Sequence, residues 1–110
     1  MTPEGKVKAK VKKLLTERGA FWYMPMGTAI YSRKGIPDFL VCYKGYFIAI
    51  ETKAGNNKPS KLQEHEMGNI FKALGIALVI NENNIQDIIR VMEAIDNENR
   101  PPVAINFSNS

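Results

Sequence analysis

The sequence predicts an α/β fold in which a mixed central sheet is flanked by helices. Apolar residues at helical spacing alternate with short β-rich runs, in the order αβββαβ with a further helix after it. The step from the strand at 46–53 to the strand at 76–80 passes through a helix, so these two strands should be parallel. A chain of 110 residues, 45% of them hydrophobic, suits one domain. We expect that domain to span residues 1–96, with 97–110 as a C-terminal tail that is either loose or an edge strand.

The N-terminal segment predicts a helix followed by a short strand. Thr2-Pro3 supplies a capping hydroxyl and a proline at the first helical position, and Gly19 marks the end. Residues 21–24 read as a strand, and residues 27–36 as a polar loop with a short strand around Ile30-Tyr31. The buried stripe of the helix should consist of Val7, Val11, Leu14 and Leu15.

The second half predicts a helix, a buried strand and a last helix. Ser60 followed by Gln63 is a capping-box pattern, and Gly75 fits the C-terminal stop of the helix that it opens. Residues 76–80 form a short apolar run, and Val103–Phe107 could pair as an edge strand. The apolar positions of the two helices are Met67, Ile70, Phe71 and Leu74 in the first, and Ile85, Ile88, Ile89 and Met92 in the second.

A predicted hairpin at 38–53 is the most informative feature. If its turn centres between Lys44 and Gly45, paired residues have numbers that sum to 89, and Asp38 faces Glu51. Directly paired residues share one side of a sheet, and Lys53, two residues beyond Glu51, shares that side too. Both faces of the hairpin are mainly apolar, so we expect it to be covered on both sides.

Two opposed carboxylates repel each other, and a hard divalent cation removes that conflict. Mg²⁺ prefers oxygen ligands, and the backbone carbonyl of Thr52 could join Asp38 and Glu51 around it. A metal held there can activate water and polarise a phosphate, while the Lys53 ammonium positions the water or balances charge. The alternative interpretation is structural: Glu51 and Lys53 form a strand-end ion pair, and Asp38 is a turn residue after proline.

Two more polar residues lie on apolar helical stripes, and each has two open interpretations. Gln63 could hold the attacking water or a phosphate, or it could simply complete the capping box. Glu4 faces inward with Val7 and Val11. It could bind a metal through water, or it could be a first-turn acid that favours the positive end of the helix dipole.

Positive charge is concentrated in the N-terminal part of the chain. The net charge is +4, but the 30 residues from 81 onward hold two basic and five acidic side chains, leaving +7 for residues 1–80. This imbalance favours a polyanionic partner, although a solvated lysine-rich helix would look the same. The residues expected to contact DNA phosphates are Lys6, Lys10, Lys13, Arg33 and Lys34. The single Cys42 cannot form an internal disulfide, no secretory signal is evident, and both observations favour an intracellular, cytoplasmic protein.

The same residues resemble a known family. Gly35-Ile36-Pro37-Asp38, Ile50-Glu51-Thr52-Lys53, Ser60-x-x-Gln63 and Leu74-Gly75 are similar to the VRR-NUC branch of the PD-(D/E)xK nuclease superfamily. The resemblance implies phosphodiester hydrolysis that depends on Mg²⁺ or Mn²⁺, with Asp38 and Glu51 as ligands, Lys53 as the catalytic lysine, and Gln63 and Glu4 as accessory residues. Short stand-alone members, found in phages and bacteria, resemble Holliday-junction resolvases and act as homodimers on branched DNA.

The sequence therefore supports three functional hypotheses. The first is a structure-selective DNA endonuclease, whose basic residues grip phosphates without reading bases. The second is a non-catalytic DNA-binding module that keeps the nuclease fold, since fold alone does not establish activity. The third is a nuclease acting on RNA, for which the sequence shows no clear stacking platform, because residues 21–23 could be core or surface.

Overall fold

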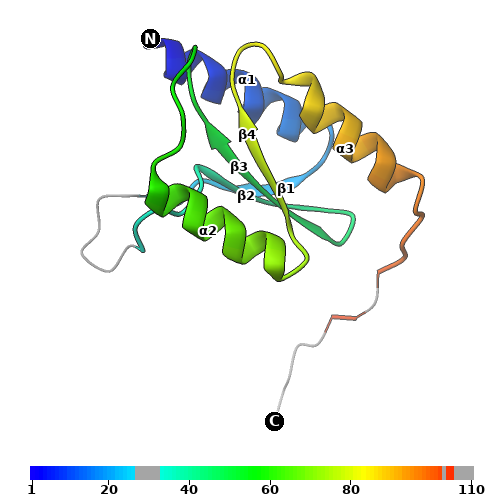
Figure 1. The fold of residues 1–110 in the computed structure, drawn as a ribbon. Helices are drawn as coiled ribbons and strands as arrows, with labels where there is room; N and C mark the ends of the chain where they lie inside the picture. Colours follow the sequence, from blue (N-terminus) through cyan, green and yellow to red (C-terminus); the bar gives the residue numbers. More distant parts are fainter. Residues whose placement is uncertain (27–32, 103, 106–110) are drawn as a thin grey trace.

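The computed structural model describes residues 1–26, 33–102, 104 and 105. Seven helices and strands are found in that part of the chain (Figure 1), and their order matches the predicted one. The expected strand at Ile30-Tyr31, and Val103, Asn106 and Phe107 of the expected C-terminal strand, lie outside the described residues. The elements are α1 (Pro3–Glu17), β1 (Phe21–Tyr23), β2 (Phe39–Tyr43), β3 (Tyr46–Thr52), α2 (Lys61–Lys72), β4 (Ile76–Ile80) and α3 (Gln86–Asp96).

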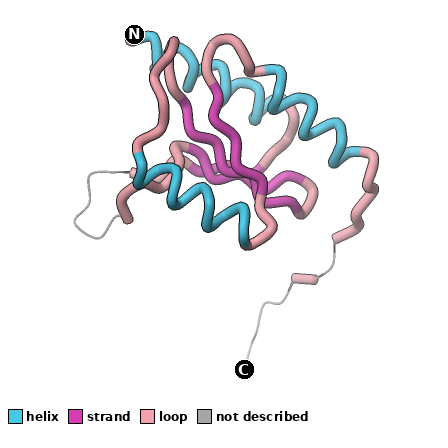
Figure 2. Tube along the Cα trace, in the orientation of Figure 1, coloured by secondary structure: helices cyan, strands magenta, loops and turns pink. Residues whose placement is uncertain are grey.

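The four strands form one mixed sheet in the order β1-β2-β3-β4 (Figure 2). The β1–β2 and β2–β3 pairs are antiparallel, and β3 and β4 are parallel. The α/β fold class and the parallel crossover predicted from the sequence are therefore confirmed. Within the hairpin Phe39 pairs with Ile50 and Tyr43 pairs with Tyr46, which is the predicted register.

The main core lies between the sheet and the layer formed by α1 and α3, while α2 covers the other face. Thr2 caps α1 by accepting a 3.0 Å hydrogen bond from the Gly5 N–H, as the sequence predicts. Alternate residues of the hairpin face this core, because successive side chains of a strand point to opposite sides. The fully buried side chains include Val11 and Leu15 of α1, Phe39, Ile48 and Ile50 of the hairpin, and Ile88 and Met92 of α3.

The face under α2 is only partly covered, so the expectation of cover on both sides of the hairpin is wrong for part of it. Phe47 is 44% exposed and Cys42 is exposed, because α2 packs mainly over β4. Phe71 and Leu74, predicted to face the core, are also exposed. The helix ends at Lys72, and Leu74 has a left-handed backbone with φ 71°, which turns its side chain outward.

Gly75 takes part in the helix stop that the sequence predicts, because its N–H donates a 2.9 Å hydrogen bond to the Ile70 carbonyl, and it is also needed for a second reason. A Cβ at this position would lie 2.7 Å from Ile70 Cγ2 and 3.3 Å from Phe47 Cδ1. The chain therefore needs glycine there because it passes so close to α2 and β3 on its way into β4.

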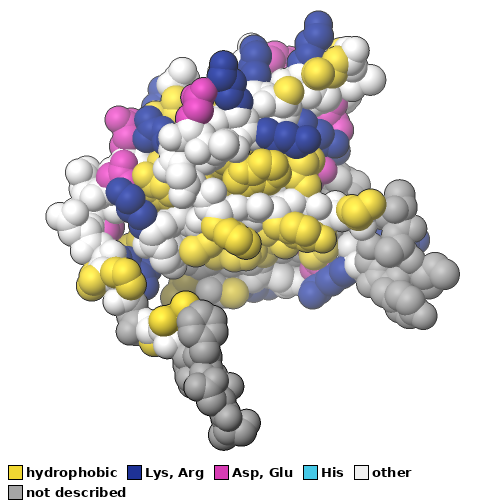
Figure 3. Space-filling model, turned by 180° about the vertical axis from the view of Figure 1, so that it is seen from behind, with side chains coloured by type: hydrophobic (Ala, Val, Ile, Leu, Met, Phe, Trp, Pro, Cys, Tyr) yellow, Lys and Arg dark blue, Asp and Glu magenta, His cyan; other side chains and the backbone are white. Residues whose placement is uncertain are grey.

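Strand β1 is one edge of the sheet, and its side chains alternate between core and surface. Trp22 is half-buried against Phe39, with ring centroids 5.9 Å apart, and it donates a hydrogen bond to Thr16 Oγ1. Phe21 and Tyr23 point to the other side and are exposed. Figure 3 shows apolar side chains gathered along this sheet edge, with Lys and Arg side chains above them. Residues 21–23 are thus neither wholly core nor wholly surface.

Two further observations complete the fold. The start of the C-terminal tail contacts the hairpin turn: the Arg100 guanidinium lies 4.8 Å from the centre of the Tyr46 ring and donates a 3.4 Å hydrogen bond to the Gly45 carbonyl. Among the described residues, no helix combines the length and the hydropathy needed to cross a membrane.

Candidate active site

The tight turn of the hairpin brings Asp38 and Glu51 to the same end of the sheet. Lys44 and Gly45 both have positive φ, 48° and 89°, which is the backbone of a two-residue hairpin turn that matches the strand twist. Asp38 directly precedes β2, and Glu51 is the second-last residue of β3. The register of the turn therefore fixes the relation between two acids that are 13 residues apart in the chain.

Asp38 is held through one of its carboxylate oxygens. Its Oδ2 accepts hydrogen bonds from the Thr52 N–H at 2.9 Å and from the Thr52 hydroxyl at 2.6 Å. Its Oδ1 lies 3.9 Å from the ammonium nitrogen of Lys8 on α1. The hydrogen bonds from Thr52 on β3 thus orient the Asp38 carboxylate, which stays partly accessible. Its Oδ1 faces the Lys8 ammonium.

Glu51 is almost fully buried, at 2% exposure, and both of its carboxylate oxygens have partners. Oε1 accepts from the Asp38 N–H at 3.2 Å, and Oε2 accepts from Gln63 Nε2 at 2.7 Å. The Lys53 ammonium is 3.4 Å from Oε2. Burial, and secondly repulsion from Asp38, raise the pKa of Glu51 to about 7, although Lys53 acts in the opposite direction. The raised pKa therefore reflects mainly the burial of Glu51, with the charge of Asp38 adding to it.

The two carboxylates are contacted by residues from different layers of the fold. Register alone would place both side chains on the face covered by α2. Glu51 does contact α2, through Gln63, but the contacts of Asp38 run to Thr52 and to Lys8 on α1. Asp38 can turn in this way because it lies just before the first residue of β2 rather than within it.

Gln63 completes the capping box, and its side chain also contacts the candidate site, while its role toward water or a phosphate stays a prediction. Its side-chain oxygen accepts from the Ser60 N–H at 2.8 Å, and Ser60 Oγ accepts from the Gln63 N–H at 3.2 Å, so the capping box is present. Its side-chain nitrogen is then left to donate to Glu51. The first turn of α2 is in this way tied directly to the carboxylate.

Glu4 contacts a lysine instead of either acid. Its Oε2 lies 3.5 Å from Lys8 Nζ, one helical turn further along α1. Sequence reasoning did not single out Lys8 or the Thr52 hydroxyl as site groups. Two features of the sequence could have indicated them. One is a glutamate–lysine pair four residues apart beside the apolar stripe of α1, and the other is a hydroxyl at a core-facing position of β3.

The other predicted DNA-contacting lysines lie elsewhere on α1. Because an α-helix turns about 100° per residue, Lys6, Lys10 and Lys13 share one flank, and Lys8 and Lys12 share the opposite one. Lys6 and Lys10 line a groove with Glu82, from the segment between β4 and α3. The structure therefore brings Lys8 close to Asp38, whereas Lys6, Lys10 and Lys13 lie exposed on the opposite flank of α1.

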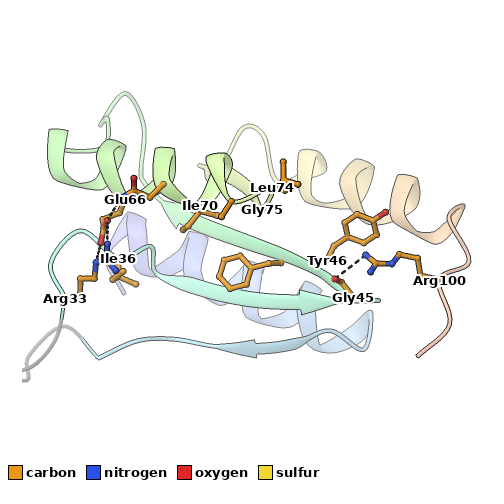
Figure 4. A pocket seen from close by; sticks show the side chains of 12 residues that line it. Arg33, Ile36, Gly45, Tyr46, Glu66, Ile70, Leu74, Gly75 and Arg100 are labelled. Atoms are coloured by element: carbon orange, nitrogen blue, oxygen red, sulfur yellow. Dashed lines mark hydrogen bonds and ion pairs between the residues drawn. The ribbon is translucent and has the colours of Figure 1, made fainter. Parts of the chain in front are cut away.

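Arg33 forms an ion pair on α2, and its neighbour Lys34 is exposed. The Arg33 Nη2 donates to Glu66 Oε1 at 2.9 Å, and Nε pairs with Oε2 (Figure 4). Desolvation acts to raise the pKa of Glu66, but hydrogen bonds from Asn69 and Arg33 hold it below its usual value. This ion pair and Arg100 lie at opposite ends of a groove whose apolar lining includes Ile36 and Ile70.

The donor groups at the hairpin end suit a hard divalent cation. Asp38 and Glu51 supply carboxylate oxygens, and the charge of Asp38 is the second cause, after burial, of the raised pKa of Glu51. In the described part of the chain, no cluster of three or more His, Cys, Asp or Glu side chains is arranged for a metal. Mg²⁺ is commonly held by only one or two carboxylates with water in its other positions, so a two-carboxylate site fits it.

Comparison with known proteins adds one finding about the fold. No protein-family model and no curated protein matches this chain. A solved structure described as "VRR_NUC domain" matches with a TM-score of 0.65 over 88% of this chain and 94% of that one, at 23% sequence identity. The chain has the fold of a VRR_NUC domain. The similarity supports the α/β fold predicted from the sequence, and it extends over most of both chains.

Proposed function

We propose that this chain is a Mg²⁺- or Mn²⁺-dependent endonuclease that hydrolyses DNA phosphodiester bonds inside bacterial or phage-infected cells. The observation that carries the proposal is the convergence of Asp38, Glu51 and Lys53 at one end of the hairpin, with Glu51 buried beside the Lys53 ammonium. A protein that only binds DNA gains nothing from holding two acids together beside a polyanion. The VRR_NUC fold supports the same conclusion.

Each residue of the centre has a role that its contacts support. Asp38 and Glu51 would hold the metal, with the Thr52 carbonyl as a further ligand. When bound, such a metal polarises a phosphate oxygen and lowers the pKa of water. Lys53, 17% exposed and 3.4 Å from Glu51, offers an ammonium that can position that water or balance charge on the phosphate. Thr52 and Gln63 keep the two carboxylates in place through their side chains.

Branched DNA, such as a Holliday junction, is the proposed substrate, with a homodimer as the active form. The exposed edge strand β1 supports the dimer, because unpaired edge strands invite pairing and the apolar Phe21 and Tyr23 would be covered by it. A two-fold dimer places two centres for paired cuts across a junction. Exposed basic residues on α1, together with Lys34, would contact phosphates without reading base sequence.

The decisive experiment compares cleavage of a four-way junction, a flap, a linear duplex, single-stranded DNA and RNA, with Mg²⁺, with Mn²⁺ or with EDTA. We expect metal-dependent cutting that is fastest on branched DNA. Asp38→Asn, Glu51→Ala and Lys53→Ala should fold and bind DNA yet cut at least about 100-fold more slowly. Glu93→Gln, an exposed acid on α3, is the matched control and should cut normally.

The alternative function is a DNA-binding module without catalysis. It would be established by DNA binding that is indifferent to metal, with no cleavage of any substrate. Undiminished cutting by both Glu51→Ala and Lys53→Ala would show instead that the centre lies elsewhere. Sedimentation of the protein with and without junction DNA tests the dimer separately from the chemistry.

A further inference from the structure

Lys8 is the charged residue of α1 that reaches the candidate metal site. Its ammonium lies 3.9 Å from Asp38 Oδ1 and 3.5 Å from Glu4 Oε2, and its side chain is 32% exposed. The neighbouring lysines of the helix, Lys6, Lys10, Lys12 and Lys13, are all exposed. Lys8 is therefore placed between carboxylates from two different elements, whereas the other four extend into solvent.

Helix geometry holds this ammonium where it is. A glutamate four residues before a lysine is the favourable order for a helical ion pair, so Glu4 restrains the Lys8 side chain. The opposite end of α1 is packed into the core through Val11 and Leu15, which fixes the helix against the sheet. The ammonium thus has a defined position beside Asp38, which few surface lysines have.

The distance to Asp38 decides what this charge does to a metal. A Mg²⁺ or Mn²⁺ ion on an Asp38 oxygen sits about 2.1 Å from that oxygen. If the oxygen is Oδ1, the ion and the Lys8 ammonium are at most about 6 Å apart, from the sum of the two distances. At that range, repulsion between a divalent ion and an ammonium is appreciable even through water, and it is only partly screened by salt.

We infer that Lys8 is a built-in counter-ion of the Asp38–Glu51 centre, which stabilises the metal-free protein and weakens its affinity for the divalent cation. The inference rests on the proposed function, because it takes the hairpin acids to be the metal ligands. Lys8 acts through Asp38 and is therefore a positioning residue. Its charge sets the metal concentration at which the centre fills.

The test measures Mn²⁺ binding to the DNA-free protein, using the electron paramagnetic resonance signal of unbound Mn²⁺. Lys8→Gln should lower the dissociation constant for Mn²⁺ by about three- to tenfold, which is the range expected for removing one cation at this distance. Lys8→Arg keeps the charge and should bind Mn²⁺ like the wild type. Lys12→Gln, on the same flank one turn further away, is the matched control for long-range charge and should change the constant by less than about twofold.

A second readout is independent of the binding titration. Without metal, Lys8→Gln should melt at a lower temperature than the wild type, because the repulsion between the acids is then less compensated. The same excess of Mn²⁺ should raise its melting temperature by more than it raises that of the wild type, since stabilisation by a ligand grows with the logarithm of its concentration over its dissociation constant. A merely structural surface residue would show the first effect without the second.

The outcomes separate the inference from the proposed function. Suppose the wild type binds Mn²⁺ in a way that Asp38→Asn abolishes, while Lys8→Gln binds it no more tightly than the wild type or Lys12→Gln. The inference is then overturned and the proposed metal site stands. If the wild type and Asp38→Asn bind Mn²⁺ equally weakly, the proposed function is overturned, and the inference with it.

Discussion

Thr52 donates both its backbone N–H and its hydroxyl to the same oxygen of Asp38, at 2.9 Å and 2.6 Å. One residue therefore fixes the carboxylate from two directions, and it does so from a position that is fully buried. The other oxygen, on the Lys8 side, remains the one that is directed toward a cation. The orientation of Asp38 thus depends on the residue next to Glu51, which couples the two halves of the centre.

The first prediction concerns the Thr52 hydroxyl. Thr52→Val keeps the shape and the backbone N–H but removes the hydroxyl donor, so Asp38 should lose part of its orientation and cleavage should slow by about tenfold. Thr52→Ser keeps the donor and should stay within about twofold of the wild type. Single-turnover cleavage at saturating Mn²⁺ measures both variants. Equal rates for valine and serine would show that the hydroxyl does not position Asp38.

The second prediction separates the two roles of Gln63. Ser60→Ala removes the helix cap but leaves the bond between Gln63 and Glu51, so it should cost about 1 kcal/mol of unfolding free energy with little loss of cleavage. Gln63→Glu keeps an acceptor for the Ser60 N–H and places a third carboxylate against Glu51. That variant should cut at least about tenfold more slowly, and in EDTA it should also be less stable, because Glu51 loses a hydrogen-bond donor and gains a like charge. If Ser60→Ala lost as much cleavage as Gln63→Glu, the helix cap and the contact with Glu51 would not be separate roles of Gln63.

Much of this arrangement could be predicted from the sequence, because it depends on local rules. The Lys44-Gly45 turn fixes the register that pairs β2 with β3, and the Thr2 and Ser60 caps fix where α1 and α2 begin. A strand–helix–strand step then allows only one hand of connection. These features follow from residues that are close together in the chain.

The remaining features depend on packing between elements that are distant in the chain. Periodicity placed Leu74 inward, but the backbone of that residue turns left-handed where α2 ends, and its side chain is 92% exposed. No spacing rule showed that Lys8 would reach Asp38, because that contact requires the crossing of α1 over the sheet to be known. The same is true of the pairing of Arg33 with Glu66, 33 residues away.

The third prediction concerns the lysines of α1 and DNA. Replacing Lys6, Lys10 or Lys13 singly by glutamine should weaken DNA binding about equally for junction and duplex. Each change should reduce the slope of log affinity against log salt concentration by about 0.9 if the lysine contacts one phosphate. Lys72→Gln, at the end of α2, is the control. A slope that falls only for Lys12→Gln would move the DNA path to the other flank of α1.

The fourth prediction concerns the loop that delivers Asp38. Gly35 has φ 82°, and a Cβ there would lie 2.8 Å from the Leu62 backbone oxygen and equally close to its side chain. Gly35→Ala should therefore displace the loop from α2 and lower both stability and cleavage, the latter by about tenfold or more. Gly55→Ala has a similar backbone strain at φ 59° with open space around it. It should cost about 1 kcal/mol and leave cleavage nearly unchanged.

The last prediction follows from the pKa of Glu51. Burial and the neighbouring Asp38 raise this pKa from 4.5 to about 7, so the native protein holds the proton more tightly than the unfolded chain. The stability that this protonation contributes is fully present below pH 4.5 and is lost as the pH rises through about 7. Metal-free protein should therefore become less stable between pH 5 and pH 8, by at most about 3 kcal/mol from this residue.

Glu51→Gln cannot titrate and should lose that part of the pH dependence, becoming more stable than the wild type at pH 8, while Glu93→Gln should keep it. Urea unfolding in EDTA at several pH values measures the difference. If the unfolding free energies of the wild type and Glu51→Gln changed with pH in parallel, Glu51 would ionise as readily in the folded protein as in the unfolded chain.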